Sequence, residues 1–87
     1  MKCLIVEDDF ATRKLMQIYL SRLGEVDIAI NGREALDVFA SALEEGQPYD
    51  LICMDIMMPE MDGMEAVRQI RRIEEQHRIL GLSGVKI

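Results

Sequence analysis

The sequence predicts an α/β fold in which parallel strands alternate with helices. Two short runs, at residues 3–6 and 51–54, are apolar throughout, as is typical of strands covered on both faces of a parallel sheet. Three longer segments carry apolar residues at helical spacing, and turn-forming residues separate them from the strands. The resulting order, β-α-β-α-β-α-β, implies right-handed crossovers and helices on both faces of one sheet.

The first half of the chain predicts two strands and one helix. Lys2–Val6 is the first strand, and residues 11–23 form a helix that Gly24 ends. Residues 25–30 alternate between apolar and acidic side chains, which favours a strand at the sheet edge with one less buried face. The apolar stripe predicted for the helix consists of Leu15, Met16, Tyr19, Leu20 and Leu23. The apolar face predicted for the second strand consists of Val26, Ile28 and Ile30.

The second half continues the alternation. Asn31, with Glu34 three residues on, resembles a capping box and begins a helix that Gly46 and Pro48 end. Leu51–Met54 is predicted to be a central strand. The apolar positions expected in the helix after Asn31 are Ala35, Leu36, Phe39, Ala42 and Leu43. A third helix is expected to begin at Asp62-Gly63 with Met64, Val67, Ile70 and Ile73 as its stripe, and Val85-Lys86-Ile87 to begin a fourth strand.

Size and charge limit the classes of function. With 87 residues, 9.9 kDa and 49% apolar residues, the chain is long enough for one globular domain. Its net charge of -6 disfavours direct binding to nucleic acid or to an anionic membrane. The N-terminal apolar run has four residues, whereas a signal peptide needs about 7–15. We therefore expect a cytoplasmic protein in which Cys3 and Cys53 are reduced packing residues.

Acidic residues follow two of the buried strands. Asp8 and Asp9 come after the first strand, and Asp55 comes directly after the third. Ligands of open parallel sheets bind at the carboxyl ends of the strands, so these carboxylates converge if the two strands are neighbours. Such a group favours Mg²⁺, to which the backbone carbonyl of Met57 could add another oxygen. The alternative is that Asp9 and Asp62 serve only as helix caps.

Two motifs identify a family. The runs LIVEDD at residues 4–9 and LICMDIMMPEMDG at residues 51–63 resemble the receiver domains of bacterial two-component response regulators, of the chemotaxis-regulator type. The resemblance implies a flavodoxin-like, doubly wound parallel sheet with strand order 2-1-3-4-5. It also implies a signalling module, not an enzyme with a separate substrate, although receivers assist their own phosphorylation. The phosphoryl donor would be a sensor histidine kinase or a phosphotransfer protein that docks on the first helix.

The resemblance also assigns roles to individual residues. Asp55 would be the phosphoacceptor, and Asp8 and Asp9 the acidic pair that holds Mg²⁺ together with Asp55 and the carbonyl oxygen of Met57. Asp55 is then the nucleophile, since an aspartate can accept a phosphoryl group when a metal ion neutralises the charge on the transferring oxygens.

The chain at residues 1–87 is expected to be a C-terminally truncated receiver, because it ends at the start of the fourth strand. The family's switch Ser or Thr after strand four and its lysine after strand five are then missing. Ser83 and Lys86 are of the right type, but they precede and lie within the fourth strand, so they are not assigned these roles. An uncovered edge on the third strand predicts a homodimer or a domain-swapped assembly.

Two other functions are compatible with parts of the pattern. A Mg²⁺-dependent phosphohydrolase could also form an aspartyl phosphate on Asp55. Phosphohydrolases of the haloacid dehalogenase type need a second acid two residues after the nucleophile, and that position is Met57. The third possibility is a structural fragment that only associates with itself through the open edge.

Overall fold

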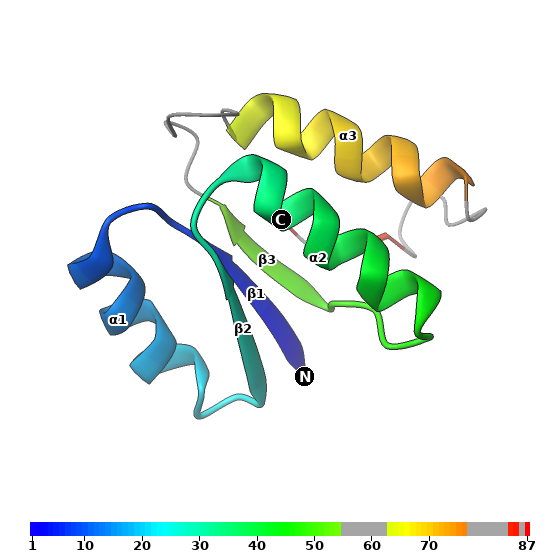
Figure 1. Ribbon diagram of the computed structural model, residues 1–87. Coiled ribbons are helices and arrows are strands. Elements are labelled where there is room, and N and C mark those ends of the chain that lie inside the picture. Colours follow the sequence, from blue (N-terminus) through cyan, green and yellow to red (C-terminus); the bar gives the residue numbers. More distant parts are fainter. Residues whose placement is uncertain (55–62, 77–83, 86) are drawn as a thin grey trace.

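The structure is a computed structural model that describes residues 1–54, 63–76, 84, 85 and 87. Strands and helices alternate along these residues as predicted (Figure 1). The elements are β1 (Lys2–Val6), α1 (Phe10–Leu20), β2 (Glu25–Ala29), α2 (Gly32–Glu44), β3 (Leu51–Met54) and α3 (Gly63–Gln76).

The described strands form one parallel sheet with the order β2-β1-β3. Val6, the last residue of β1, lies opposite Ala29 on one side and Met54 on the other. The predicted parallel pairing is confirmed, and so is the edge position of β2. Among the described residues β1 lies in the middle of the sheet and β3 pairs with β1. The predicted central position of β3 belongs to the order 2-1-3-4-5, whose fourth and fifth strands are not among the described elements.

The main core lies between the sheet and the helices α2 and α3, which share one face of the sheet while α1 lies on the other (Figure 1). Helix α2 turns Ala35, Phe39 and Ala42 toward the sheet, as its sequence predicts. The buried residues of this core are Leu4, Val6, Ala29, Ala35, Phe39, Ala42, Tyr49, Ile52, Ile70 and Val85.

Capping fixes both ends of α2. The side-chain oxygen of Asn31 accepts a hydrogen bond from the backbone N–H of Glu34 at 2.8 Å, as a helix N-cap does. The Glu34 carboxylate in turn accepts the N–H of Ile30 at 3.3 Å, one residue earlier than in the standard capping box. At the other end Gly46 has φ of +73°, which glycine adopts without strain, and the chain leaves the helix there. The predicted limits of this helix are confirmed.

Helix α1 departs from its prediction in burial and in length. None of its residues is buried, and Leu15 and Tyr19, which were expected in the core, are 66% and 73% exposed. Among the described elements α1 packs mainly on β1, so its outer side has no cover. The helix ends at Leu20, three residues before the predicted end, and a turn leads to Gly24.

Gly24 is required by packing at the start of β2. A Cβ atom at this position would lie 2.0 Å from the backbone oxygen of Met1, a distance that no side chain tolerates. That same oxygen accepts the N–H of Glu25 at 3.0 Å. Only a residue without a side chain lets the two backbones approach closely enough for this bond.

The faces of β2 differ from the predicted ones. Ala29 is buried against α2, and Asp27, on the same face, accepts a hydrogen bond from the Tyr49 hydroxyl at 2.5 Å. Val26 and Ile28 are only half-buried, and Ile30 lies beyond the strand and is exposed. Asp27 is half-buried on the predicted acidic face, where the Tyr49 hydroxyl is its polar partner, while Glu25 on the same face is exposed.

Two expectations for the C-terminal part need correction. In α3, Ile70 is fully buried as predicted, but Met64 is 53% exposed. Residues 84, 85 and 87 belong to no strand, so the predicted start of a fourth strand is not found among the described residues. Val85 is buried in the core, but its N–H donates to the Glu74 carboxylate at 2.7 Å and takes no part in a sheet ladder.

Both cysteines are free, as predicted. Cys3 is buried and Cys53 half-buried. Burial raises the pKa of both thiols, which keeps them protonated and favours packing over reactivity.

The fold predicts a large cost for truncating the central aromatic side chain of α2. Phe39→Ala should lower the free energy of unfolding by about 3–5 kcal/mol, because a cavity replaces a side chain that is 1% exposed. Met64→Ala is the matched control and should change stability by no more than about 0.5 kcal/mol. Urea denaturation followed by circular dichroism measures both, and equal losses in the two variants would contradict this location of the core.

Candidate functional site

The predicted site lies at the carboxyl edge of the sheet. Its acids can converge only if β1 and β3 are neighbours, and the structure confirms that they pair directly, with Val6 opposite Met54. Asp8 and Asp9 are the second and third residues after β1, and both are exposed. Asp55 and Met57, the other two predicted site residues, lie outside the described residues.

Asp9 is the N-cap of α1. Its Oδ2 atom accepts hydrogen bonds from the backbone N–H of Thr12 at 2.9 Å and from the Thr12 hydroxyl at 2.6 Å. The hydroxyl bond, followed by the backbone bond, lowers the pKa of the Asp9 carboxyl below its usual value. Both bonds use Oδ2, so Oδ1 takes part in neither. Capping and cation binding, posed as alternatives from the sequence, are therefore compatible at Asp9.

Glu7 holds the turn between β1 and α1 in place. Its N–H donates to the carbonyl oxygen of Ala29 at 3.1 Å and extends the pairing with β2 by one residue. Its carbonyl oxygen accepts the Arg13 guanidinium at 3.2 Å, and its carboxylate accepts the N–H of Asp9 at 3.2 Å. These bonds fix the backbone on both sides of Asp8.

Sequence reasoning did not identify Glu7, Thr12 or Arg13 as part of this region. The role of Thr12 could have been predicted from its spacing. A threonine three residues after a capping aspartate can donate hydrogen bonds from both its amide and its hydroxyl to that aspartate. The contacts of Glu7 and Arg13 depend on how the turn folds back onto the strand, so the residue types alone do not reveal them.

The acids in the described part of the chain do not complete a metal site. Within residues 1–54, 63–76, 84, 85 and 87, no group of three or more His, Cys, Asp or Glu side chains is placed to hold a metal ion. Asp8 and Asp9 provide two carboxylates at one edge, and oxygen ligands of this kind suit Mg²⁺.

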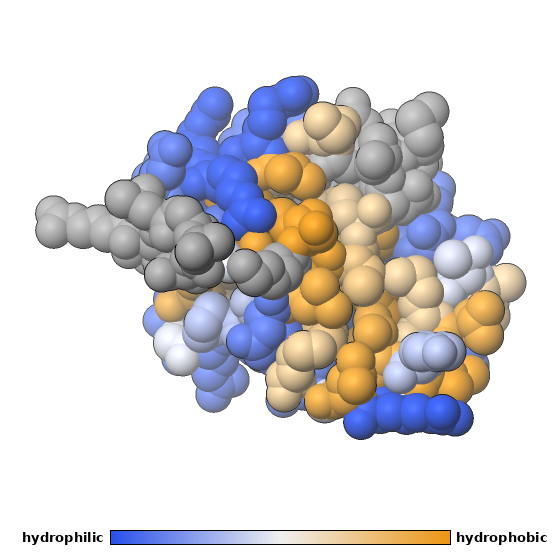
Figure 2. Space-filling model, turned by 180° about the vertical axis from the view of Figure 1, so that it is seen from behind, coloured by the Kyte–Doolittle hydropathy of each residue, from blue (hydrophilic) through white to orange (hydrophobic). Residues whose placement is uncertain are grey.

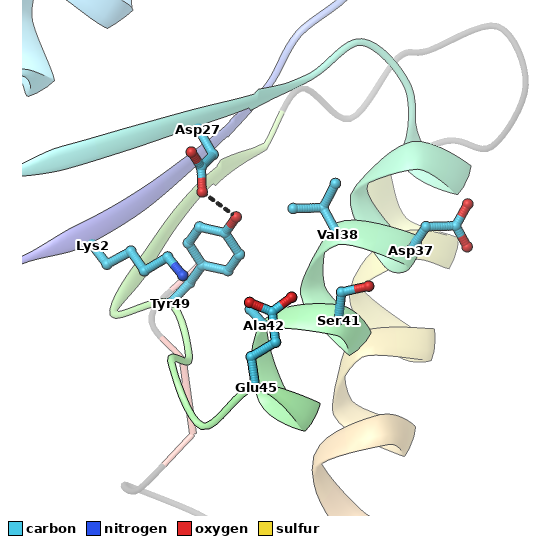
Figure 3. A pocket seen from close by; sticks show the side chains of 8 residues that line it. All are labelled: Lys2, Asp27, Asp37, Val38, Ser41, Ala42, Glu45 and Tyr49. Carbon is cyan, nitrogen blue, oxygen red and sulfur yellow. Dashed lines mark hydrogen bonds between the residues drawn. The ribbon is translucent and has the colours of Figure 1, made fainter.

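A separate pocket opens at the other end of the strands (Figure 3). It has a volume of about 280 Å³ and lies between α2, β2 and the segment before β3. Inside it the Tyr49 hydroxyl donates to Asp27, and the Lys2 ammonium lies 4.7 Å from the centre of the Tyr49 ring. Burial and the Asp27 carboxylate raise the pKa of Tyr49. The pocket contains none of the predicted site residues, and its lining consists of Lys2, Asp27, Asp37, Val38, Ser41, Ala42, Glu45 and Tyr49.

The described residues thus form an α/β domain with a parallel sheet and two carboxylates at its carboxyl edge, where open sheets of this class generally bind their ligands. The chain belongs to the response regulator receiver domain family, whose model matches residues 3–86. The resemblance that the two motifs suggested is thereby confirmed, and so is the flavodoxin-like fold of that family.

Relatives from several organisms are similar to the chain. Two-component response regulator 24 of Arabidopsis thaliana is 40% identical over 81 residues, which are 92% of this chain. The receiver domain of the histidine kinase CKI1 from the same plant, solved with Mg²⁺ and BeF₃⁻, is 37% identical with a TM-score of 0.81 over 91% of the chain. The receiver domain of Saccharomyces cerevisiae Ssk1, solved with the phosphotransfer protein Ypd1, is 31% identical with a TM-score of 0.78 over the whole chain.

The chain spans only part of each relative. It covers 55% of regulator 24, 60% of the CKI1 receiver chain and 59% of the chain solved with Ypd1. In the described part of the chain, no helix combines the length and the apolar character needed to cross a membrane.

The hydrogen bonds at Asp9 predict a pH effect. Because the folded state lowers the Asp9 pKa, the carboxylate stabilises the fold above its unfolded pKa of about 3.9, and this contribution is lost as the pH falls through the folded pKa. Thr12→Val removes the hydroxyl bond, so the Asp9 pKa should rise toward its ordinary value and acid unfolding should begin at higher pH. Thr12→Ser, which keeps the hydroxyl, is the control. NMR titration of the Asp9 carboxyl gives the pKa, and an unchanged value in Thr12→Val would contradict this cause.

Proposed function

We propose that this receiver domain accepts a phosphoryl group on Asp55, with Mg²⁺ held by Asp8, Asp9, Asp55 and the backbone oxygen of Met57. The observation that carries the proposal is the direct pairing of β1 and β3, which ends with Val6 opposite Met54. Asp55 follows Met54 in the sequence, so the phosphoacceptor and the acidic pair follow neighbouring strand ends. The Mg²⁺ and BeF₃⁻ in the similar CKI1 receiver support the same ligand chemistry.

The reaction is a phosphoryl transfer from a histidine to an aspartate. A carboxylate oxygen of Asp55 forms the new bond to phosphorus while the bond between phosphorus and the donor imidazole nitrogen breaks, and the imidazole leaves with its electron pair and takes up a proton. Mg²⁺, when bound, neutralises charge on the transferring oxygens. The hydrogen bonds from Thr12 keep Asp9 ionised, and the backbone bonds of Glu7 fix the turn that carries Asp8. Both effects prepare the acidic pair for a cation before it arrives.

The proposed role is that of a signalling module and not of an enzyme with a separate substrate. The domain would assist its own phosphorylation and dephosphorylation, as the family does. We place it in the cytoplasm, because two free cysteines suit a reducing compartment.

The proposed partner is a sensor histidine kinase or a phosphotransfer protein, and α1 is the proposed docking surface. Residues 10–23 contain three basic side chains, Arg13, Lys14 and Arg22, and no acidic one, although the whole chain has a net charge of -6. The apolar side chains exposed on the same segment are Phe10, Leu15, Ile18, Tyr19 and Leu23. Basic charge around exposed apolar groups suits a partner with an apolar surface and an acidic rim. The Ssk1 receiver that binds Ypd1 is a precedent for a phosphotransfer partner.

Phosphorylation should be detectable by intact-mass spectrometry. In the presence of Mg²⁺ and a small phosphodonor, the chain should gain the mass of one phosphoryl group, and chelation of Mg²⁺ should prevent the gain. Asp55→Asn should abolish it, because an amide is too weak a nucleophile to attack phosphorus.

Asp50→Asn is the matched control for this experiment. Asp50 directly precedes β3, whereas Asp55 directly follows it. The Asp50 carboxylate accepts the backbone N–H of Lys2 at 2.7 Å, at the opposite end of the strands from Asp55. This variant should still be phosphorylated. Phosphorylation of Asp55→Asn, or a gain that does not depend on Mg²⁺, would refute the assignment.

We also propose that two copies of this chain associate into a homodimer or a domain-swapped assembly. Within the described residues β3 pairs with β1 on one side only, and its other side is open to a second chain. A band of apolar side chains crosses the molecule when it is seen from behind (Figure 2). An unpaired strand edge favours pairing with a second copy, and exposed apolar surface favours association in general.

Analytical ultracentrifugation tests the association. The wild-type chain should sediment with twice its mass of 9.9 kDa, and Leu51→Lys should sediment as a monomer, because a lysine on the edge strand β3 opposes pairing with a second chain. Leu15→Glu/Ile18→Glu changes the exposed face of α1 and leaves the edge of β3 intact, so it is the control and should remain dimeric. A monomeric wild-type chain over a wide concentration range would rule the assembly out.

A further inference from the structure

A buried carboxylate lies in the last turn of α3. Glu74 is 3% exposed, although glutamate is usually an exposed residue. Its Oε1 atom accepts a hydrogen bond from the Arg71 guanidinium at 2.7 Å, and the two side chains form an ion pair. Its Oε2 atom accepts the backbone N–H of Val85, also at 2.7 Å. Burying a carboxylate without partners costs free energy, and here both oxygens of the Glu74 carboxylate accept a hydrogen bond.

Gly84 packs directly against this ion pair. A Cβ atom at residue 84 would lie 2.8 Å from a guanidinium nitrogen of Arg71 and 2.9 Å from Oε1 of Glu74. These side-chain ends could move away only by giving up the bonds that hold them. The absence of a side chain at residue 84 therefore allows the segment to approach α3 closely enough for the bond to Val85.

The neighbouring side chain reinforces the contact. Val85 is 6% exposed and belongs to the same core cluster as Ile70 of α3. If the segment left α3, the Val85 side chain would enter water and Glu74 would lose one of its two partners while still beside the core. Breaking the hydrogen bond and exposing Val85 are therefore coupled, which favours a docked and an undocked state over intermediate ones.

We propose that Glu74 is a latch that holds the segment Gly84–Val85 on the C-terminal turn of α3. While it is closed, the helix and the segment move as one unit. Opening it releases the segment without disrupting the pairing of β1 with β2 and β3. The latch is at the end of α3 away from the candidate site, since the helix begins at Gly63 and Glu74 is in its last turn (Figure 1). The proposed latch does not require phosphorylation of Asp55.

Amide hydrogen exchange of the 87-residue chain, measured by NMR, tests the latch. Glu74→Ala should accelerate exchange of the Val85 amide by about 10- to 100-fold, the range expected for losing a hydrogen bond to a charged group. Gly84→Ala should have the same effect by forcing the segment away from the ion pair. In both variants the amides of Leu4 and Val6 in β1 should exchange at wild-type rates.

Two further variants make the result decisive. Glu75→Gln changes the exposed neighbouring acid and should leave the Val85 amide unchanged. Glu74→Gln keeps the size of the side chain and a neutral acceptor oxygen, so it should accelerate exchange of the Val85 amide less than Glu74→Ala does. If Glu74→Ala does not fold, the Val85 exchange rate in Glu74→Gln tests the latch. An unchanged Val85 rate in every Glu74 variant would overturn the latch. Equal acceleration at Val85, Leu4 and Val6 would also overturn it, because Glu74 would then stabilise the whole fold.

Discussion

The fold depends on the pairing of β1 with a strand on each side. Residues 3–6 of β1 have no exposed surface, because β2 and β3 cover the strand laterally and helices lie over both faces of the sheet. Leu4 and Val6 contribute to the core beneath α2 and α3, while Cys3 and Ile5 alternate onto the face of α1. The pairing that buries this strand also aligns its carboxyl end with that of β3, so one interaction determines both the core and the location of the candidate site.

The sequence predicts elements better than it predicts their surroundings. Apolar runs located β1 and β3, and the spacing of Ala35, Phe39 and Ala42 identified the buried face of α2. The same reasoning failed for Leu15 and Tyr19 of α1, because periodicity tells which residues share a face and not whether another element covers that face. The burial of Glu74 cannot be read from the sequence for a related reason. Its burial follows from contacts with residues 84 and 85, ten and eleven positions later, which local spacing cannot reveal.

The candidate site shows the same difference between what local sequence predicts and what depends on the packing of distant segments. The sequence has acids after two predicted strands, but whether these acids converge depends on the strand order. Residue patterns alone do not give that order, and only the family resemblance implies it. The pairing of β1 with β3 confirms that condition. For Asp9 the sequence offered a cap or a ligand, and the geometry reconciles them because both Thr12 bonds go to one carboxylate oxygen. A carboxylate can thus fix a helix start and still present an oxygen to a cation.

The close contact between Met1 and the start of β2 has a practical consequence. The carbonyl oxygen of Met1 accepts the N–H of Glu25, Gly24 packs against the Met1 backbone, and the N–H of Lys2 donates to Asp50. An affinity tag joined directly to Met1 would therefore begin at a tightly packed position, where two loops contact the sheet. A purification handle placed there needs a flexible spacer, and a reporter attached at that end would sense the packing of these loops.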